Sequence, residues 1–200
     1  MKANFKSTEL ALRLWRQMYQ TYTLLKRCED QIFEKYGLTT EQYSVLVAID
    51  YFGGPTRVTD IARWLERSTN SISMIVDRMV KAGLVKRMRS TGDRRVVRVV
   101  NTSKGEAALK PANLASLDRI SKILSSLSSE NRSTLLNLLG TLKYEMLKHL
   151  NPRVDITEVK RTEFKQAANL KKWVSKYGLP STPQAKHQGG EKRKTKKKTK

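Results

Sequence analysis

The chain of 200 residues is poor in cysteine and histidine, with one and two of them respectively. One cysteine cannot form an internal disulfide, and so few cysteines and histidines provide no ligand set for a metal site of that kind. No apolar run approaches the ~20 residues of a membrane-spanning helix, and residues 1–6 lack the apolar core of a signal peptide. We therefore expect a cytoplasmic protein without metal, cofactor or membrane partner.

Catalytic motifs are missing too. Gly189 and Gly190 lack the spacing of a phosphate-binding loop, and no serine lies in a nucleophile elbow. The sequence therefore argues against an enzyme.

Positive charge is what the chain has in excess. Its 40 Lys and Arg residues oppose 18 Asp and Glu residues, which gives a formal net charge of +22 at pH 7. Residues 56–100 contain 11 basic and four acidic residues, and residues 151–200 contain 15 basic and four acidic ones. A chain this basic is expected to bind a polyanion, either a nucleic acid or an acidic membrane surface.

Residues 56–102 carry the most informative pattern. Residues 59–65 predict a short helix, and after a polar break Ser68 or Thr69 is expected to cap a second helix over residues 70–82. Apolar residues at helical spacing predict the inner face of this second helix, namely Ile72, Ile75, Val76, Met79 and Val80. Two helices joined by such a turn present the second one to the major groove of DNA.

A basic hairpin is expected to follow directly. Residues 84–89 and 96–101 are of strand length, and the loop between them holds Gly92. A hairpin beside a helix-turn-helix is a wing, and Arg94 and Arg95 at its tip suit a narrow minor groove. The alternative is a solvated basic hairpin without a partner.

Short motifs in this order and spacing resemble the multiple antibiotic resistance regulator (MarR) family over about residues 5 to 150. They are Leu38-Thr-x-x-Gln-Tyr-x-Val-Leu46, Ile61-Ala62, Asp77-Arg78-Met79-x-x-x-Gly83-Leu84-Val85, Asp93-Arg94-Arg95 and Thr102-x-x-Gly105. The resemblance implies a dimeric winged-helix transcription factor, usually a repressor, often released from DNA by a small molecule or an oxidant. It also implies that Asp93 braces the wing and that Arg95 reaches the minor groove. One departure is Met74, where members commonly carry a basic or polar residue.

The expected fold is mainly α, a winged helix-turn-helix with a small β-hairpin wing that dimerises through its N- and C-terminal helices. Residues 1–36 are predicted as the N-terminal dimerisation helix and residues 37–102 as the DNA-binding domain. Residues 103–150 would hold the C-terminal dimerisation helices, residues 151–177 an extra amphipathic helix, and residues 178–200 a disordered lysine-rich tail. The apolar stripes of the terminal helices exceed what one small core can cover, which favours a homodimer over a monomeric bundle.

Double-stranded DNA is the predicted partner, bound at a pseudo-palindromic operator, with a small-molecule effector as a further candidate partner. The expected DNA-binding residues are Thr69, Asn70, Ser71, Ser73, Met74, Arg78, Lys81, Lys86, Arg87, Arg89, Asp93, Arg94 and Arg95. As a DNA-binding protein it is expected in the cytoplasm, associated with the nucleoid. Two other functions stay open, a sequence-tolerant architectural chromatin protein that binds DNA and an RNA-binding winged helix. The polycation at residues 191–200 is the main argument for the architectural function.

Two further features of the helices give predictions. Pro111 lies too far into the helix after the wing for a first-turn position, so we expect a kink or a restart there. Asp155 is expected to cap a helix whose apolar face holds Ile156, Val159, Ala167, Leu170, Val174 and Tyr177. That face either docks on the protein's own dimer or meets a partner or ligand.

Cys28 is the one candidate redox residue. Some members of the resembling family sense peroxides through one cysteine in the first helix. Hydroxyl groups that could bond a thiolate there belong to Tyr19, Tyr22, Tyr43 and Tyr51. The charges beside Cys28 are mixed, however, and a buried cysteine is an ordinary core residue, so we favour a structural role.

Overall fold

The computed structural model describes the backbone of residues 5–89 and 97–177, and the side chains of residues 8–88 and 97–177. Helices dominate it, together with one small sheet. In chain order the elements are α1 (Phe5–Phe33), the 3-10 helix η1 (Glu34–Tyr36), α2 (Thr40–Tyr51), β1 (Thr56–Arg57), α3 (Val58–Trp64), α4 (Thr69–Lys81), β2 (Val85–Arg89), β3 (Val97–Asn101), α5 (Ser103–Leu124), α6 (Ser129–Leu150) and α7 (Ile156–Lys176). Within these ranges no helix combines the length and the apolar character needed to cross a membrane.

Polar caps fix where the helices begin. At α2 the Thr39 hydroxyl accepts from the backbone N–H of Gln42, whose side chain accepts in turn from the N–H of Thr39, a complete capping box. Ser68 caps α4, so this helix begins at Thr69, one residue before the predicted start. The same role is filled at α5, α6 and α7 by Thr102, Ser128 and Asp155.

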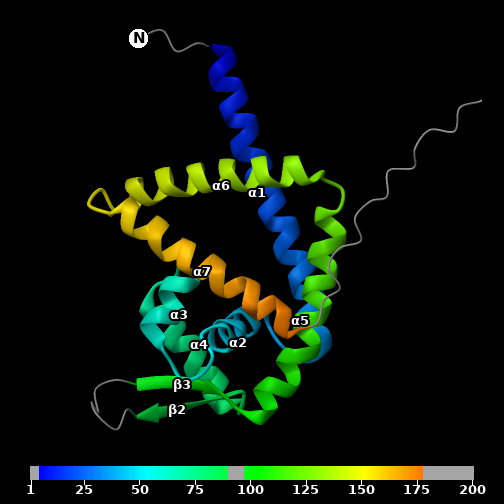
Figure 1. The fold of residues 1–200 in the computed structure, drawn as a ribbon, viewed down its shortest axis with the longest axis vertical. Helices are drawn as coiled ribbons and strands as arrows, with labels where there is room; N and C mark the ends of the chain where they lie inside the picture. The colour runs from blue at the N-terminus through cyan, green and yellow to red at the C-terminus, as the bar shows by residue number, and fades with distance from the viewer. Residues whose placement is uncertain (1–4, 90–96, 178–200) are drawn as a thin grey trace, which may run out of the picture.

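Two predicted helices differ from the structure in detail. The helix expected to reach residue 36 ends at Phe33, where the chain tightens into η1 and Gly37 adopts a left-handed φ of 67°. After the wing, α5 runs unbroken past Pro111, so the restart does not occur. Figure 1 shows α5 changing direction along its length, as expected where a proline removes one hydrogen bond.

The sheet is antiparallel with the order β1-β3-β2. Its central strand β3 pairs with both others, since Val99 lies opposite Thr56 on one side and Arg87 on the other. β2 and β3 form the predicted hairpin and occupy one end of the molecule, far from α6 (Figure 1).

One core lies under the sheet and is shared by α2, α3, α4, the end of α1 and the start of α5. Its fully buried side chains include Phe33, Leu46, Ile61, Ile72 and Met79. Val80, predicted on the inner face of α4, is 38% exposed because it lies at the edge of the apolar stripe.

The remaining helices contribute little to this core. α6 contains no buried residue, and it exposes leucines such as Leu136, at 71%. The first part of α1 behaves in the same way, with Trp15 at 65%. From the end of α6, α7 returns diagonally to α2 and α5 (Figure 1).

Candidate nucleic-acid interface

The outer face of α4 carries most of the predicted DNA-binding residues. Thr69, Asn70, Met74, Arg78 and Lys81 are exposed. Ser71 and Ser73 are half-buried at the sides of this face, while the opposite stripe of α4 packs into the core. α4 therefore offers a polar and basic surface whose centre is occupied by Met74.

The turn before α4 is short and strongly bonded. Glu66 adopts a φ of 51°, a left-handed conformation that is uncommon outside glycine and lets the chain reverse quickly. The N–H of Arg67 donates to the carbonyl of Ala62 at 2.9 Å, and the Ser68 hydroxyl accepts from the N–H of Ser71 at 3.2 Å. These bonds set the position of α4 relative to α3.

A groove runs along the side of α4 toward the start of α2. It has a volume of about 360 Å³ and is lined in part by Thr39, Gln42, Arg67, Met74 and Arg78. Arg67 and Arg78 give this side of α4 positive charge, which the carboxylate of Glu41 in the same groove offsets in part.

The root of the wing is fixed to the end of α4 by the Thr102-x-x-Gly105 motif. The Thr102 hydroxyl donates to the carbonyl of Gly83 at 2.6 Å and accepts from the N–H of Gly105 at 3.1 Å. A Cβ atom at Gly105 would lie 2.1 Å from the carbonyl oxygen of Leu84, so only glycine fits. The Lys104 Nζ adds a bond of 2.8 Å to the carbonyl of Ala82.

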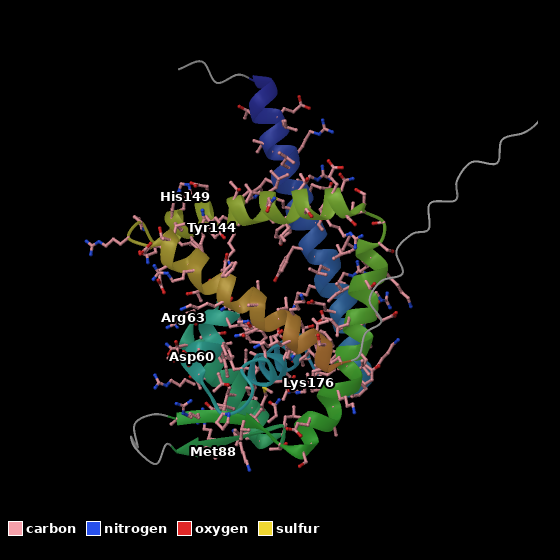
Figure 2. The ribbon with its side chains drawn as sticks, in the orientation of Figure 1. Asp60, Arg63, Met88, Tyr144, His149 and Lys176 are labelled. Atoms are coloured by element: carbon pink, nitrogen blue, oxygen red, sulfur yellow. The ribbon has the colours of Figure 1, made fainter. Side chains whose placement is uncertain are left out.

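An ion pair joins the wing to α4. Arg87 Nη2 lies 2.8 Å from Asp77 Oδ1, and both side chains are about half exposed. Arg87, predicted as a phosphate contact, is thus already paired within the protein, and it neutralises a carboxylate on the face of α4. Lys86 on the same strand is exposed, and Figure 2 shows Met88 farther along it.

The tip of the predicted wing, with Asp93, Arg94 and Arg95, lies outside the described residues. The same is true of the side chain of Arg89 and of the lysine-rich tail, residues 178–200.

A contact that the sequence analysis missed holds α7 against α2. Asp50 Oδ2 accepts hydrogen bonds from Trp173 Nε1 at 2.7 Å and from the Tyr177 hydroxyl at 2.6 Å, while Asp50 Oδ1 accepts from Lys176 Nζ at 2.6 Å. We call these four residues the α7 clasp. Burial raises the pKa of Asp50, but the three hydrogen bonds outweigh it and hold that pKa below its ordinary value of 3.8.

The clasp corrects part of the predicted packing of α7. Four residues of the predicted apolar face are half-buried, namely Ile156, Val159, Val174 and Tyr177, whereas Ala167 and Leu170 are exposed. Trp173, which was not on that face, packs against the core. α7 therefore docks on α2 of its own chain. A tryptophan and a tyrosine four residues apart were the signal that could have indicated this face.

A second contact links α6 to the turn before α4. Lys143 Nζ lies 3.2 Å from Glu66 Oε1 and 2.6 Å from Glu163 Oε1, and the Tyr144 hydroxyl donates to the other oxygen of Glu163 at 2.6 Å. Burial lowers the pKa of Lys143, but the two carboxylates raise it by more, so that it lies above 10.5. The α6 helix, α7 and the turn before α4 are joined at this one amine.

Cys28 lies half-buried in α1. Two of the four tyrosines proposed as its partners donate elsewhere, Tyr43 to Asn113 Oδ1 and Tyr51 to the carbonyl of Gln166, both at 2.7 Å. Burial raises the pKa of Tyr43 to about 12. Neither hydroxyl is free for a thiolate, which corrects that expectation.

Known proteins resemble this chain in sequence and in fold. Residues 38–97 match the MarR family model. The HTH-type transcriptional regulator PecS of Dickeya dadantii (strain 3937) is 30% identical over 129 residues, which cover 64% of this chain and 75% of PecS. Overoxidized AbfR bound to DNA aligns with a TM-score of 0.57 and 25% identity, over 70% of this chain and 98% of AbfR.

The ligand-free organohalide-sensing regulator RdhR-CbdbA1625 shares the fold. Its TM-score is 0.66 at 24% identity, and the alignment covers 76% of this chain and 90% of that one. The predicted winged helix-turn-helix is confirmed, and the chain belongs to the MarR family of DNA-binding transcriptional regulators.

Proposed function

We propose that the protein is a homodimeric repressor that binds a pseudo-palindromic operator. The observation that carries this proposal is the absence of any buried residue in α6, beside a complete helix-turn-helix. Apolar helices without a core need a second copy of the chain to cover them. A two-fold dimer presents two α4 helices related by symmetry, and such a reader fits an inverted repeat.

The proposed contacts follow from the exposed face of α4. Asn70, Ser73, Met74 and Arg78 face base edges in the major groove, and Lys81 and Lys86 contact phosphates. From the sequence, Arg94 and Arg95 extend into the minor groove. Arg87 is better understood as a support of the wing, since its guanidinium is bound to Asp77.

A cavity between α1, α2 and α4 supports release by a small-molecule effector. Its volume is about 200 Å³, and its lining includes Tyr22, Leu25, Glu29 and Ile72. A ligand here would touch both the dimerisation helix α1 and the inner side of α4. A thermal-shift screen of small aromatic acids against wild type and Leu25→Trp, which fills the cavity, checks this proposal. A compound that stabilises both proteins equally binds elsewhere.

Two other functions have their own signatures. An architectural protein would bind unrelated duplexes with equal affinity, and a redox regulator would leave DNA on peroxide treatment unless Cys28 were changed to serine. We expect neither result, because α4 presents a defined surface and because two of the four tyrosines proposed beside Cys28, Tyr43 and Tyr51, donate their hydroxyl hydrogens elsewhere.

Binding to two duplexes tests the proposal. One carries the region flanking the protein's own gene, and the other has the same composition in scrambled order. We expect the first to bind at least about 1,000-fold more tightly at physiological salt, with two chains per duplex by sedimentation. Equal affinities, or one chain per duplex, would contradict the proposal.

A further inference from the structure

Met74 is an exposed apolar residue on a face of α4 that is otherwise polar and basic. It is 66% exposed, the most exposed large apolar side chain within residues 38–89 and 97–102. Asn70 and Arg78 lie one helical turn before and after it on the same face, and both are exposed. The apolar side chain thus lies at the centre of the α4 face, between two side chains that form hydrogen bonds.

Nothing in the described part of the chain covers Met74. The groove at its side is lined mostly by polar and charged residues, among them Arg67 and Ser71. Its other apolar residue, Ile75, is itself buried in the core. An exposed methionine gains free energy only when its methyl and thioether groups leave water for an apolar surface. Its flexible side chain can adapt to such a surface.

The major groove offers few apolar surfaces. The edges of guanine, adenine and cytosine present hydrogen-bond donors and acceptors, whereas thymine also presents its 5-methyl group. A basic or amide side chain at position 74 would favour purine acceptors. Because a methionine side chain cannot donate a hydrogen bond, the favourable contact for it in the major groove is an apolar one with the thymine methyl group.

We propose that Met74 reads a thymine through its 5-methyl group, once in each half-site. This inference rests on the proposed placement of α4 in the major groove, and it names the base that this position selects. Asn70 and Arg78 then contact the edges of the neighbouring base pairs, so that the apolar contact is enclosed by polar ones.

The test begins with selection of bound duplexes from a random library. Wild type, Met74→Ala and Met88→Ala are compared; the last removes an exposed methionine from the wing strand β2 and is the matched control. Thermal melts check that all three fold alike. We expect wild type and Met88→Ala to enrich a motif with a thymine in each half-site and Met74→Ala to lose the preference at that position.

Atomic substitution in the DNA then isolates the methyl group. Uracil replaces the selected thymine in both half-sites, which removes only the methyl. We expect the affinity of wild type and Met88→Ala to fall about 15-fold, from ~0.8 kcal/mol for each methyl group. For Met74→Ala the change should be less than about twofold.

The outcomes separate the two claims. Wild type that enriches a motif but binds the uracil duplex as tightly as the thymine duplex would overturn the Met74 assignment alone. The same holds if Met74→Ala keeps both the thymine preference and the uracil sensitivity. Wild type that enriches no motif would overturn the proposed sequence-specific function, and the assignment with it.

Discussion

Asp50 and Trp173 are 123 residues apart in the sequence, yet the indole Nε1 of Trp173 donates to Asp50 Oδ2 at 2.7 Å. The bond connects the last helix, α7, with α2, which supports α4 from behind. Figure 2 shows Lys176 at the same end of α7, close to α2. With the side chain of Asp50 only 16% exposed, the carboxylate depends on these partners for its solvation.

Removal of this carboxylate should release α7. Asp50→Ala leaves three donors without their shared acceptor, so we expect a loss of about 2 kcal/mol in the free energy of unfolding. Amide exchange over residues 156–177 should become faster. Asp60→Ala is the control, since among the residues with described side chains Asp60 forms an ion pair only with Arg63, within α3 and at 3.8 Å (Figure 2). Unchanged exchange in Asp50→Ala would show that apolar packing alone holds α7.

Acid should weaken the same contact. Because the pKa of Asp50 in the folded protein lies below its ordinary value of 3.8, the folded state binds the proton less tightly than the unfolded state. The contribution is therefore complete well above pH 3.8 and is lost as the pH falls through the folded pKa. Urea unfolding of wild type and Asp50→Asn from pH 6 to pH 3 measures it. The difference in the free energy of unfolding between the two proteins should become smaller as the pH approaches 3. A difference that stays constant over this range would show that the Asp50 carboxylate is not the source of the acid sensitivity.

Gly105 should tolerate no side chain. In Gly105→Ala the new Cβ would lie 2.1 Å from the carbonyl oxygen of Leu84, and the backbone must move to relieve the clash. We expect a loss of about 3 kcal/mol and weaker DNA binding, since the root of the wing moves with it. Gly140→Ala is the control, where the nearest atom, Tyr144 Cε2, is 4.0 Å away. Similar melting temperatures for both variants would contradict the role given to Gly105.

A charge on α6 should break the dimer. Leu139 is 48% exposed in the single chain, and in the proposed dimer it is covered by the second copy. Leu139→Asp would bury an unpaired carboxylate there, at a cost of several kcal/mol. Sedimentation at micromolar concentration should give a monomer for Leu139→Asp and a dimer for wild type. The control Phe52→Asp, which changes an exposed apolar position outside α1 and α6, should also stay a dimer. A monomeric wild type would contradict the dimer itself.

The lysine-rich tail should set affinity without setting sequence choice. Residues 178–200 contain eight Lys or Arg and one Glu. Each phosphate that they neutralise adds about 0.9 to the slope of log affinity against log salt. Truncation after Gly178 should lower the affinity for the operator and for the scrambled duplex by similar factors. It should also reduce the slope of log affinity against log salt by several units. A collapse of the ratio between the two affinities would mean that the tail reads sequence.

Local signals explain what the sequence could predict. The cap at Ser68, the glycine at position 83 and the cap at Thr102 act within a few residues of the helix ends. The predicted helix over residues 70–82 therefore agrees with α4 to within one residue at each end. The α7 clasp has no local signature, because Asp50 meets its partners only after the whole chain has folded. Helical periodicity predicted α7 and part of the face that packs, including Tyr177, but it missed Trp173, which lay outside the predicted apolar stripe.

The central claim is that this chain recognises one inverted repeat as a dimer. DNase I footprinting on the DNA that flanks its own gene tests it most directly. We predict protection of a single site with two symmetric halves, about one helical turn apart, at protein concentrations that leave the rest of the fragment open. Protection that spreads evenly over the fragment as the protein concentration rises would contradict the claim.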